Sequence, residues 1–315
     1  NMPPHSSLMF LGKGHIVTLE ELLLGMAISS GNDAAYAVAY KICGSMQDFV
    51  ARMNDVAQQY GLKNTHFVDS SGYSELNSTT AREMATFAQI YLQLHPEALE
   101  KFHKVPSFTY PKPHNMAPQD EYGAQDWSQG LPETITMGIT QKNTNPLLDK
   151  LPGCDGLKTG FTDNAMYCMA VTAKRDGMRL LAIVLGEPKG STRNEEISEL
   201  LDYGFNTYKI NNFMEKDSVV DEIYFDKGTL EKVNIYLKEN ASILMKQSDS
   251  INGYDTEIKL DKITLPLRSG DVVGKYLIKK NNDIVNKIDL IVKDNVNEKN
   301  FFELFLDILK DTLIV

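Results

Sequence analysis

The sequence predicts an α+β protein in which helices pack on an antiparallel sheet, followed by a small all-β domain and a C-terminal amphipathic helix. Apolar residues recur at helical spacing through much of the N-terminal third, and β-prone runs follow between residues 157 and 185. After Asn212, short runs rich in Val, Ile and Tyr alternate with Gly, Asn and Asp turns. We therefore expect the parts of the chain to cover 1–211, 212–297 and 298–315.

The N-terminal part carries the start signals of four helices. Thr18 is followed three residues later by Glu21, and Thr80 by Glu83, and this spacing is typical of the capping box that opens a helix. The second helix is rich in Ala and apolar on most sides, which indicates a position in a domain centre. The expected helices cover residues 18–28, 33–43, 45–60 and 80–94.

A proline-rich stretch precedes the sheet. Four prolines between residues 106 and 118 exclude regular structure there, so we expect a surface excursion.

Asp176-Gly177 lies between two β-prone runs and is a strong signal for a two-residue hairpin. A helix is expected after the hairpin, over 191–208. The expected strands cover 157–159, 165–173 and 178–185, and in the β domain 218–225, 233–237, 254–260, 272–279 and 284–292.

Composition and charge exclude several classes of function. The 315 residues include 32 Lys and Arg against 42 Asp and Glu, a net charge of -10, so a basic nucleic-acid-binding face is not expected. No run of 18 apolar residues could span a bilayer. The three cysteines form no CxxC pair and the six histidines have no metal-ligand spacing, so we expect no metal and no cofactor. The histidines are expected to be surface or loop residues; they are His5, His15, His66, His95, His103 and His114.

Two short motifs indicate where the chemistry lies. Ser30-Gly31-Asn32 occupies a turn that opens a buried helix, and Lys158-Thr159-Gly160 lies on a strand that enters the hairpin. Either motif alone is explained by a helix-capping turn or an ordinary edge strand. Their occurrence together, in this order and in these contexts, points to one site.

With these motifs the sequence resembles the serine-type D-alanyl-D-alanine carboxypeptidases, low-molecular-mass penicillin-binding proteins that share the serine β-lactamase fold. The resemblance extends into the β domain and the terminal helix. It implies removal of the terminal D-alanine from peptidoglycan stem peptides ending in D-Ala-D-Ala, inhibition by β-lactam antibiotics, and a location at the outer face of the bacterial cytoplasmic membrane or in the periplasm. Further similar stretches are residues 6–10, 61–67, 81–85 and 155–162.

The resemblance also implies roles for the residues of the two motifs. Ser30 would relay a proton to the leaving group, Asn32 would hydrogen-bond the substrate amide, and Lys158 would supply positive charge in the cleft. Gly160 would leave room for the substrate as an added strand, and the backbone N–H of Phe161 would be one oxyanion donor.

The terminal carboxylate of the substrate needs an anchor, and the resemblance assigns it to Thr159 and Arg193. Thr159 offers a hydroxyl from the second motif, while the Arg193 guanidinium matches a carboxylate in shape and charge. Without the resemblance, a solvated arginine at the start of a helix is the better explanation of Arg193.

The nucleophile of the family lies in an S-x-x-K box, and no Ser of this chain is followed three residues later by Lys. Asn1 is not an initiator methionine and no signal peptide follows it, so we expect the peptidase domain to be N-terminally incomplete and this chain to be inactive by itself. One alternative is a catalytically dead protein that binds cell-wall peptides. The other is a class A β-lactamase, which normally shows S-D-N and a glutamate loop that are not found here.

The C-terminal helix is expected to contact a membrane surface without crossing it. Its 16 residues, 300–315, rise about 24 Å, which is shorter than a hydrocarbon core of about 30 Å. Its apolar face is rich in Phe and Leu, which suits an interfacial anchor. The alternative is that this helix docks on the β domain or on a partner.

Overall fold

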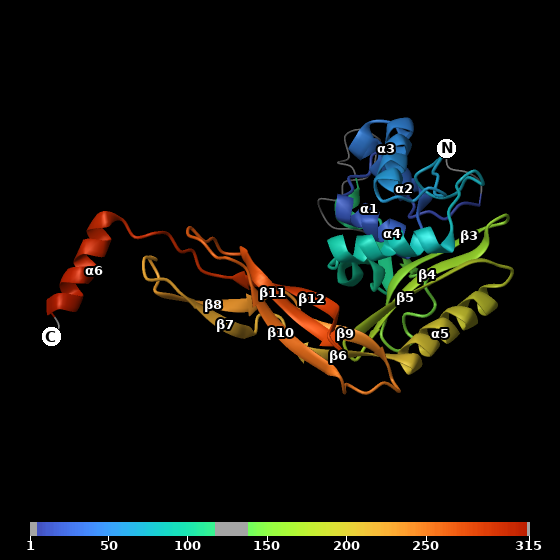
Figure 1. Cartoon of the computed structure of the whole chain (residues 1–315). Coiled ribbons are helices and arrows are strands. Elements are labelled where there is room, and N and C mark those ends of the chain that lie inside the picture. The colour runs from blue at the N-terminus through green and yellow to red at the C-terminus, as the bar shows by residue number, and fades with distance from the viewer. Residues whose placement is uncertain (1–4, 117–137, 314–315) are drawn as a thin grey trace. The chain divides into compact units, whose positions relative to one another are not determined.

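The computed structural model describes residues 5–116 and 138–313 (Figure 1). The chain folds into two compact units, Asn1–Phe205 and Asn206–Val315. The first unit combines helices with antiparallel strands, and the second consists of strands and a terminal helix. The predicted α+β class with a following β domain is therefore confirmed.

Four helices form the N-terminal part at the predicted places: α1 (Leu19–Ile28), α2 (Asn32–Cys43), α3 (Met46–Gln59) and α4 (Ala81–Leu94). The capping box of α1 is complete, because the Thr18 hydroxyl accepts from the Glu21 N–H and the Glu21 carboxylate accepts from the Thr18 N–H. At α4 the reciprocal half of the predicted box is wrong. The Thr80 hydroxyl caps the helix, but the Glu83 carboxylate accepts hydrogen bonds from the nearby loop residues Asn64 and Thr65.

A three-stranded antiparallel sheet of order β3-β4-β5 supports the first unit. Its strands are β3 (Cys154–Thr162), β4 (Met166–Arg175) and β5 (Met178–Glu187). Asp176 and Gly177 connect β4 to β5 with φ of 47° and 79°, the left-handed pair that a two-residue hairpin requires. The predicted hairpin is confirmed, and β3 lies at the other edge of the sheet.

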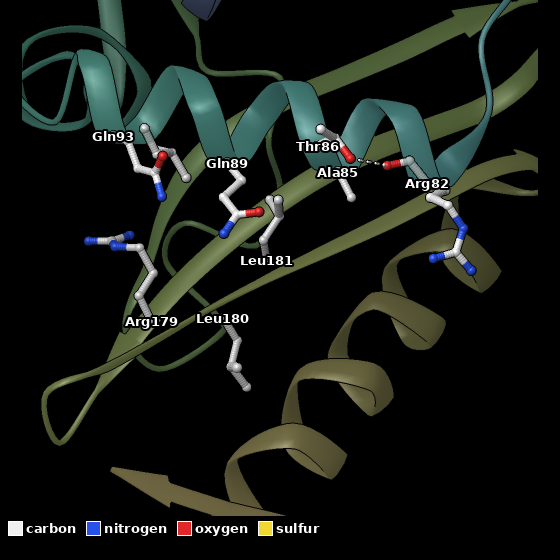
Figure 2. Close-up of a pocket in the computed structure, with 9 residues that line it drawn as sticks. Arg82, Ala85, Thr86, Gln89, Gln93, Arg179, Leu180 and Leu181 are labelled. Atoms are coloured by element: carbon white, nitrogen blue, oxygen red, sulfur yellow. Dashed lines mark hydrogen bonds between the residues drawn. The ribbon is translucent and has the colours of Figure 1, made fainter. Parts of the chain in front are cut away.

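Helices cover both faces of this sheet. The consecutive residues Leu180 and Leu181 of β5 point to opposite faces. Leu181 packs with Ala88 of α4, and Leu180 contacts the backbone of α5 (Gly190–Thr207) at Gly204. Figure 2 shows α4 and α5 on opposite sides of these strands. The sheet is thereby the middle layer of three.

The expectation that residues 106–118 lack regular structure is wrong. Strand β1 (Ser107–Tyr110) pairs antiparallel with β2 (Ile139–Lys142), and a short 3-10 helix covers Pro113–Asn115. Pro106 and Pro111 flank β1 without entering it, and Pro113 takes the first position of the 3-10 turn, where no N–H donor is needed. Pro118 lies outside the described residues.

The second unit is a β domain followed by a helix. A five-stranded antiparallel sheet has the order β10-β11-β12-β8-β7, and a separate pair joins β6 to β9. Sequence analysis missed β6 and β9, because β6 follows α5 without a breaker and has Asn at its centre, while β9 mixes strand and helix formers. The elements are β6 (Tyr208–Met214), β7 (Val219–Tyr224), β8 (Lys232–Leu237), β9 (Ala241–Lys246), β10 (Tyr254–Leu260), β11 (Val272–Lys280), β12 (Asp283–Val292) and α6 (Phe301–Leu313).

The interior of the β domain is aliphatic. Ile235, Leu237, Leu290 and Val292 are fully buried and belong to one cluster with Met245 of β9. Across residues 5–116 and 138–313, no helix combines the length and the apolar content that a membrane crossing requires.

Candidate active site

The turn between α1 and α2 places Ser30 in an unusual backbone conformation. Its φ is 58°, in the left-handed region that residues other than glycine rarely adopt. The next residue leaves little room for a side chain, because a Cβ on Gly31 would lie 3.0 Å from the Met9 backbone nitrogen. The turn is therefore shaped by close packing against the preceding chain segment.

The chain segment of residues 7–11 is hydrogen-bonded to this turn and to the start of α2. The Asp33 carboxylate accepts from the backbone N–H groups of Met9 and Leu11, both at 2.9 Å. The Asn32 N–H donates to the Ser7 carbonyl at 2.8 Å. Sequence analysis did not single out Asp33, although it directly follows Ser30-Gly31-Asn32 and an acidic residue in a first helical turn is a capping signal.

Lys158 of β3 reaches the turn. Its ammonium donates to Ser30 Oγ at 2.9 Å and to the Thr159 carbonyl at 2.8 Å. Burial, and after it the positive charge of Arg193, lower the pKa of Lys158 from 10.5 to about 8. The structure thus brings together two residues 128 positions apart and gives the lysine a pKa close to neutral pH, where small changes can move a proton.

His103 supports β3 just before Lys158. Its Nδ1 lies 3.1 Å from the Leu157 carbonyl and its Nε2 lies 2.8 Å from the Tyr91 hydroxyl. Burial lowers the pKa of His103, so the ring is neutral at pH 7. Because a carbonyl only accepts, Nδ1–H donates to Leu157 and Nε2 accepts from Tyr91. The expectation that all six histidines are surface or loop residues is therefore wrong for His103.

The segment Asn143-Thr144-Asn145 ties the two motif-bearing elements together. The Thr144 N–H donates to the carbonyl of Ile28, the last residue of α1, at 3.0 Å. The Asn145 amide donates to the Gly156 carbonyl on β3 at 3.3 Å. Sequence analysis missed this segment, because its role depends on contacts with other elements, from Gly156, 11 positions away, to Ile28 in the first helix.

Beyond Lys158, β3 runs along the open edge of the sheet. The Thr159 hydroxyl donates to Thr144 Oγ1 at 2.8 Å. A Cβ on Gly160 would meet only Cys168, at an ordinary 3.7 Å, so nothing within the described residues requires glycine at this position. Phe161 is 56% exposed, and its ring lies 4.5 Å from that of Tyr167. An edge strand with an unfilled position is suited to accept an added strand.

Arg193 lies in the first turn of α5 and is almost fully buried, with 7% exposure. Its Nη1 donates to the Cys168 carbonyl at 3.4 Å, and Cys168 is the β4 partner of Gly160. Its Nε and Nη2 donate to Asn194 Oδ1 at 3.2 and 2.9 Å, and the guanidinium lies over the Tyr167 ring. This guanidinium is therefore buried and held in place by hydrogen bonds, and the explanation as a solvated surface arginine is wrong.

The predicted site residues therefore gather at one end of the sheet, around the hydrogen bond between Ser30 and Lys158. Asn32 lies in the first turn of α2 and is nearly buried, with 9% exposure. The two cations, Lys158 and Arg193, suit an anionic ligand. Within the described part of the chain, no group of three His, Cys, Asp or Glu side chains could hold a metal ion.

A separate groove of about 750 Å³ lies between α4 and β5 (Figure 2). None of the predicted site residues lines it. Arg179, on one wall, forms a bidentate ion pair with Asp155 at 2.7 and 2.8 Å, so its charge is already neutralised. The other lining residues are Arg82, Ala85, Thr86, Gln89, Leu92, Gln93, Leu180 and Leu181.

Two family models match the chain. Residues 1–189 match the family described as D-alanyl-D-alanine carboxypeptidase. Residues 208–298 match the family described as penicillin-binding protein 5, C-terminal domain. Together they cover both units.

Individual relatives agree with these matches. D-alanyl-D-alanine carboxypeptidase DacF from Bacillus subtilis (strain 168) is 32% identical, over 94% of this chain and 70% of that protein. The crystal structure of penicillin-binding protein 5 from Haemophilus influenzae has a TM-score of 0.65 and 29% identity, over 94% of this chain and 79% of that one. Penicillin-binding protein D2 from Listeria monocytogenes, in its cefotaxime-bound form, has a TM-score of 0.52 and 28% identity, over 64% of this chain and 73% of that one.

Proposed function

The chain belongs to the D-alanyl-D-alanine carboxypeptidase family, and from this premise we propose that Ser30 and Lys158 carry the proton-transfer step of the reaction. The observation that supports the proposal most is the hydrogen bond of 2.9 Å between Lys158 Nζ and Ser30 Oγ. With a pKa of about 8, Lys158 is protonated in most molecules at pH 7 and still close enough to neutrality to exchange a proton through Ser30. The alternative of a β-lactamase is not supported by the family matches.

The reaction is an acyl transfer. A serine attacks the carbonyl of the D-Ala-D-Ala peptide bond, the leaving D-alanine amine takes a proton, and water later hydrolyses the acyl-enzyme. In our proposal the attacking serine gives its proton to the lysine of the missing S-x-x-K box, and Ser30 relays a proton from that lysine to the amine. The charge of Lys158 orients the Ser30 hydroxyl for this relay. Asn32 hydrogen-bonds the substrate amide, and the Phe161 N–H is one donor to the oxyanion. Because the 315 residues contain no S-x-x-K box, we propose that they form no acyl-enzyme by themselves.

The substrate would lie along the open edge of β3. Gly160 leaves space for the peptide backbone, and the terminal carboxylate would meet the Thr159 hydroxyl and the Arg193 guanidinium. β-Lactam antibiotics would occupy the same edge of β3, since they carry a carboxylate and an acylating carbonyl. The cefotaxime-bound form of the Listeria relative supports this part of the proposal.

Two substitutions test separately the proposed roles of Lys158 in acylation and of Arg193 in carboxylate binding. Both are made in protein that carries an S-x-x-K box. Lys158→Ala should abolish most acylation by a fluorescent penicillin, because the lost charge acts on the transition state. Arg193→Ala should mainly weaken hydrolysis of peptides with a free C-terminal carboxylate. If Arg193→Ala keeps the wild-type ratio between free-acid and amidated peptides, the anchor assignment is wrong. If wild-type protein with the box forms no adduct, the alternative of a dead binding protein is favoured.

Peptidoglycan, the substrate of the family, lies outside the cytoplasm. We propose that the peptidase domain of 1–211 and the β-rich domain of 212–297 work at the outer face of the cytoplasmic membrane or in the periplasm, held there by 298–315. The exposed apolar residues of α6 support this location: Phe301, Phe302, Phe305, Leu306 and Leu309. Glu303, Asp307 and Asp311 outnumber Lys310 in the sequence of this helix, so binding must come from apolar burial and not from anionic lipid.

Liposome co-sedimentation tests the membrane proposal. The intact chain should pellet with neutral and anionic vesicles alike, and deletion of 298–315 should release it. Phe301→Ser combined with Phe302→Ser is a matched variant that keeps the helix length and should release it in part. An intact chain that stays in the supernatant with both vesicle types would favour docking of the helix on the β domain.

A further inference from the structure

We propose that Thr144 is a positioning residue for the carboxylate of the substrate, acting through the hydroxyl of Thr159. This inference rests on the proposed function, in which Thr159 binds that carboxylate. Thr144 Oγ1 is the acceptor of the Thr159 hydroxyl, at 2.8 Å. Neither motif includes Thr144, which lies 14 positions before Lys158.

The backbone around Thr144 is fixed on both sides. The Asn143 amide donates to the carbonyls of His103 and Val105, both at 3.0 Å. The Asn145 amide donates to Gly156, and its Oδ1 accepts from the Leu147 N–H at 2.9 Å. Flanking anchors of this kind hold an exposed side chain in one place, as a binding site needs.

The hydroxyl of Thr144 has a different task from its backbone. The Thr144 N–H already secures the segment to Ile28, and a valine at this position would keep that bond. The side chain is exposed, so its hydroxyl satisfies no buried group, and it accepts a hydrogen bond from the Thr159 hydroxyl. The hydroxyl is therefore available for the ligand site rather than needed by the fold.

A hydroxyl can donate and accept at once, so the pair can reverse its direction. In the structure Thr159 donates to Thr144. When a carboxylate binds, the Thr159 hydrogen turns to the carboxylate, and the Thr144 hydrogen turns to Thr159 Oγ1. Each hydrogen bond in such a chain polarises the next, which makes Thr159 a better donor to the negative charge. Thr144 thereby favours ligands that end in a carboxylate.

The test compares equilibrium binding of two ligands to the 315-residue chain, N-acetyl-D-alanyl-D-alanine and its C-terminal amide, by NMR titration. Thr144→Val removes the hydroxyl and keeps the shape, so it should weaken binding of the free acid about fivefold and leave the amide unchanged. Thr144→Ser restores the hydroxyl and should restore the preference for the acid. Amide spectra of each variant verify the fold.

The outcomes separate this inference from the proposed function. If Thr159→Val lowers the preference for the acid and Thr144→Val does not, Thr144 has no positioning role while the anchor stands. If Thr144→Val weakens both ligands equally, Thr144 acts only through the fold, and the inference is wrong. If the wild-type chain itself binds the acid no better than the amide, the carboxylate anchor is overturned.

Discussion

Replacing Lys158 with methionine tests the electrostatics of the site without requiring catalysis. Burial, together with the charge of Arg193, lowers the pKa of this lysine from 10.5 to about 8 in the folded chain. Unfolding returns the ammonium to water and to its ordinary pKa. Between about pH 8 and 10.5 the unfolded chain therefore binds more protons than the folded one, and stability rises with pH through this window.

The magnitude follows from the two pKa values. Lowering the pKa from 10.5 to about 8 corresponds to about 3 kcal/mol of lost stability at pH 7. As the pH rises from 7 to 9.5, the folded chain regains about 2 kcal/mol of this lost stability, by integration of the difference in bound protons over pH. Methionine has a similar length and no charge, so the Lys158→Met protein lacks this dependence. The wild type should therefore gain about 2 kcal/mol relative to the variant between pH 7 and 9.5.

Urea unfolding followed by far-UV circular dichroism measures the difference at both pH values. Other groups titrate alike in the two proteins, and subtraction removes their contribution. Lys174→Met is a matched control, because it removes an exposed lysine from the neighbouring strand β4. If the difference in free energy of unfolding between wild type and Lys158→Met stays constant from pH 7 to 9.5, the reasoning is refuted, since the ammonium of Lys158 would then not be desolvated.

Three further predictions concern the first unit, two from its charges and one from the absent S-x-x-K box. Arg193→Ala removes the cation next to Lys158, so the pKa of Lys158, read from the same urea series, should rise above about 8. Burial raises the pKa of Glu21, but hydrogen bonds from Thr18, Asn115 and His114 outweigh it and lower the pKa from 4.5 to about 2. Glu21→Gln should therefore cost up to about 3 kcal/mol at pH 7, and this difference should fade as the pH drops from 4.5 towards 2. Mass spectrometry should detect no stoichiometric penicillin adduct on the 315-residue chain, and such an adduct would contradict the roles proposed for Ser30 and Lys158.

Local signals in the sequence were sufficient for much of the fold. Thr18 and Glu21 predict the start of α1, and Asp176-Gly177 predicts the β4–β5 hairpin, because both depend on residues within one turn. The order of the two motifs, with the family resemblance, also selects Ser30 and Lys158, whose side chains meet in the structure.

The remaining parts depend on contacts that are distant in sequence. Thr144 becomes a neighbour of the second motif only because its backbone bonds Ile28 and its side chain meets Thr159. His103 was expected to be a loop residue, since nothing in the sequence near it reveals the Leu157 carbonyl that it contacts. Strands β1 and β2 pair although 28 residues separate them, 21 of which the structure does not describe, and no local pattern predicts their pairing.

The left-handed backbone of Ser30 affects which residues at this position are favoured when variants are selected for thermal stability. An L-residue with a φ of 58° costs about 1 kcal/mol that glycine avoids, and asparagine tolerates the region better than most residues. A library randomised at position 30 and sorted for thermal tolerance alone should therefore enrich glycine and asparagine. Neither has a hydroxyl to accept the proton of Lys158. A screen for thermostable variants therefore needs a second selection for ligand binding or activity. Without it, the most stable variants at position 30 will lack the hydroxyl that the reaction needs.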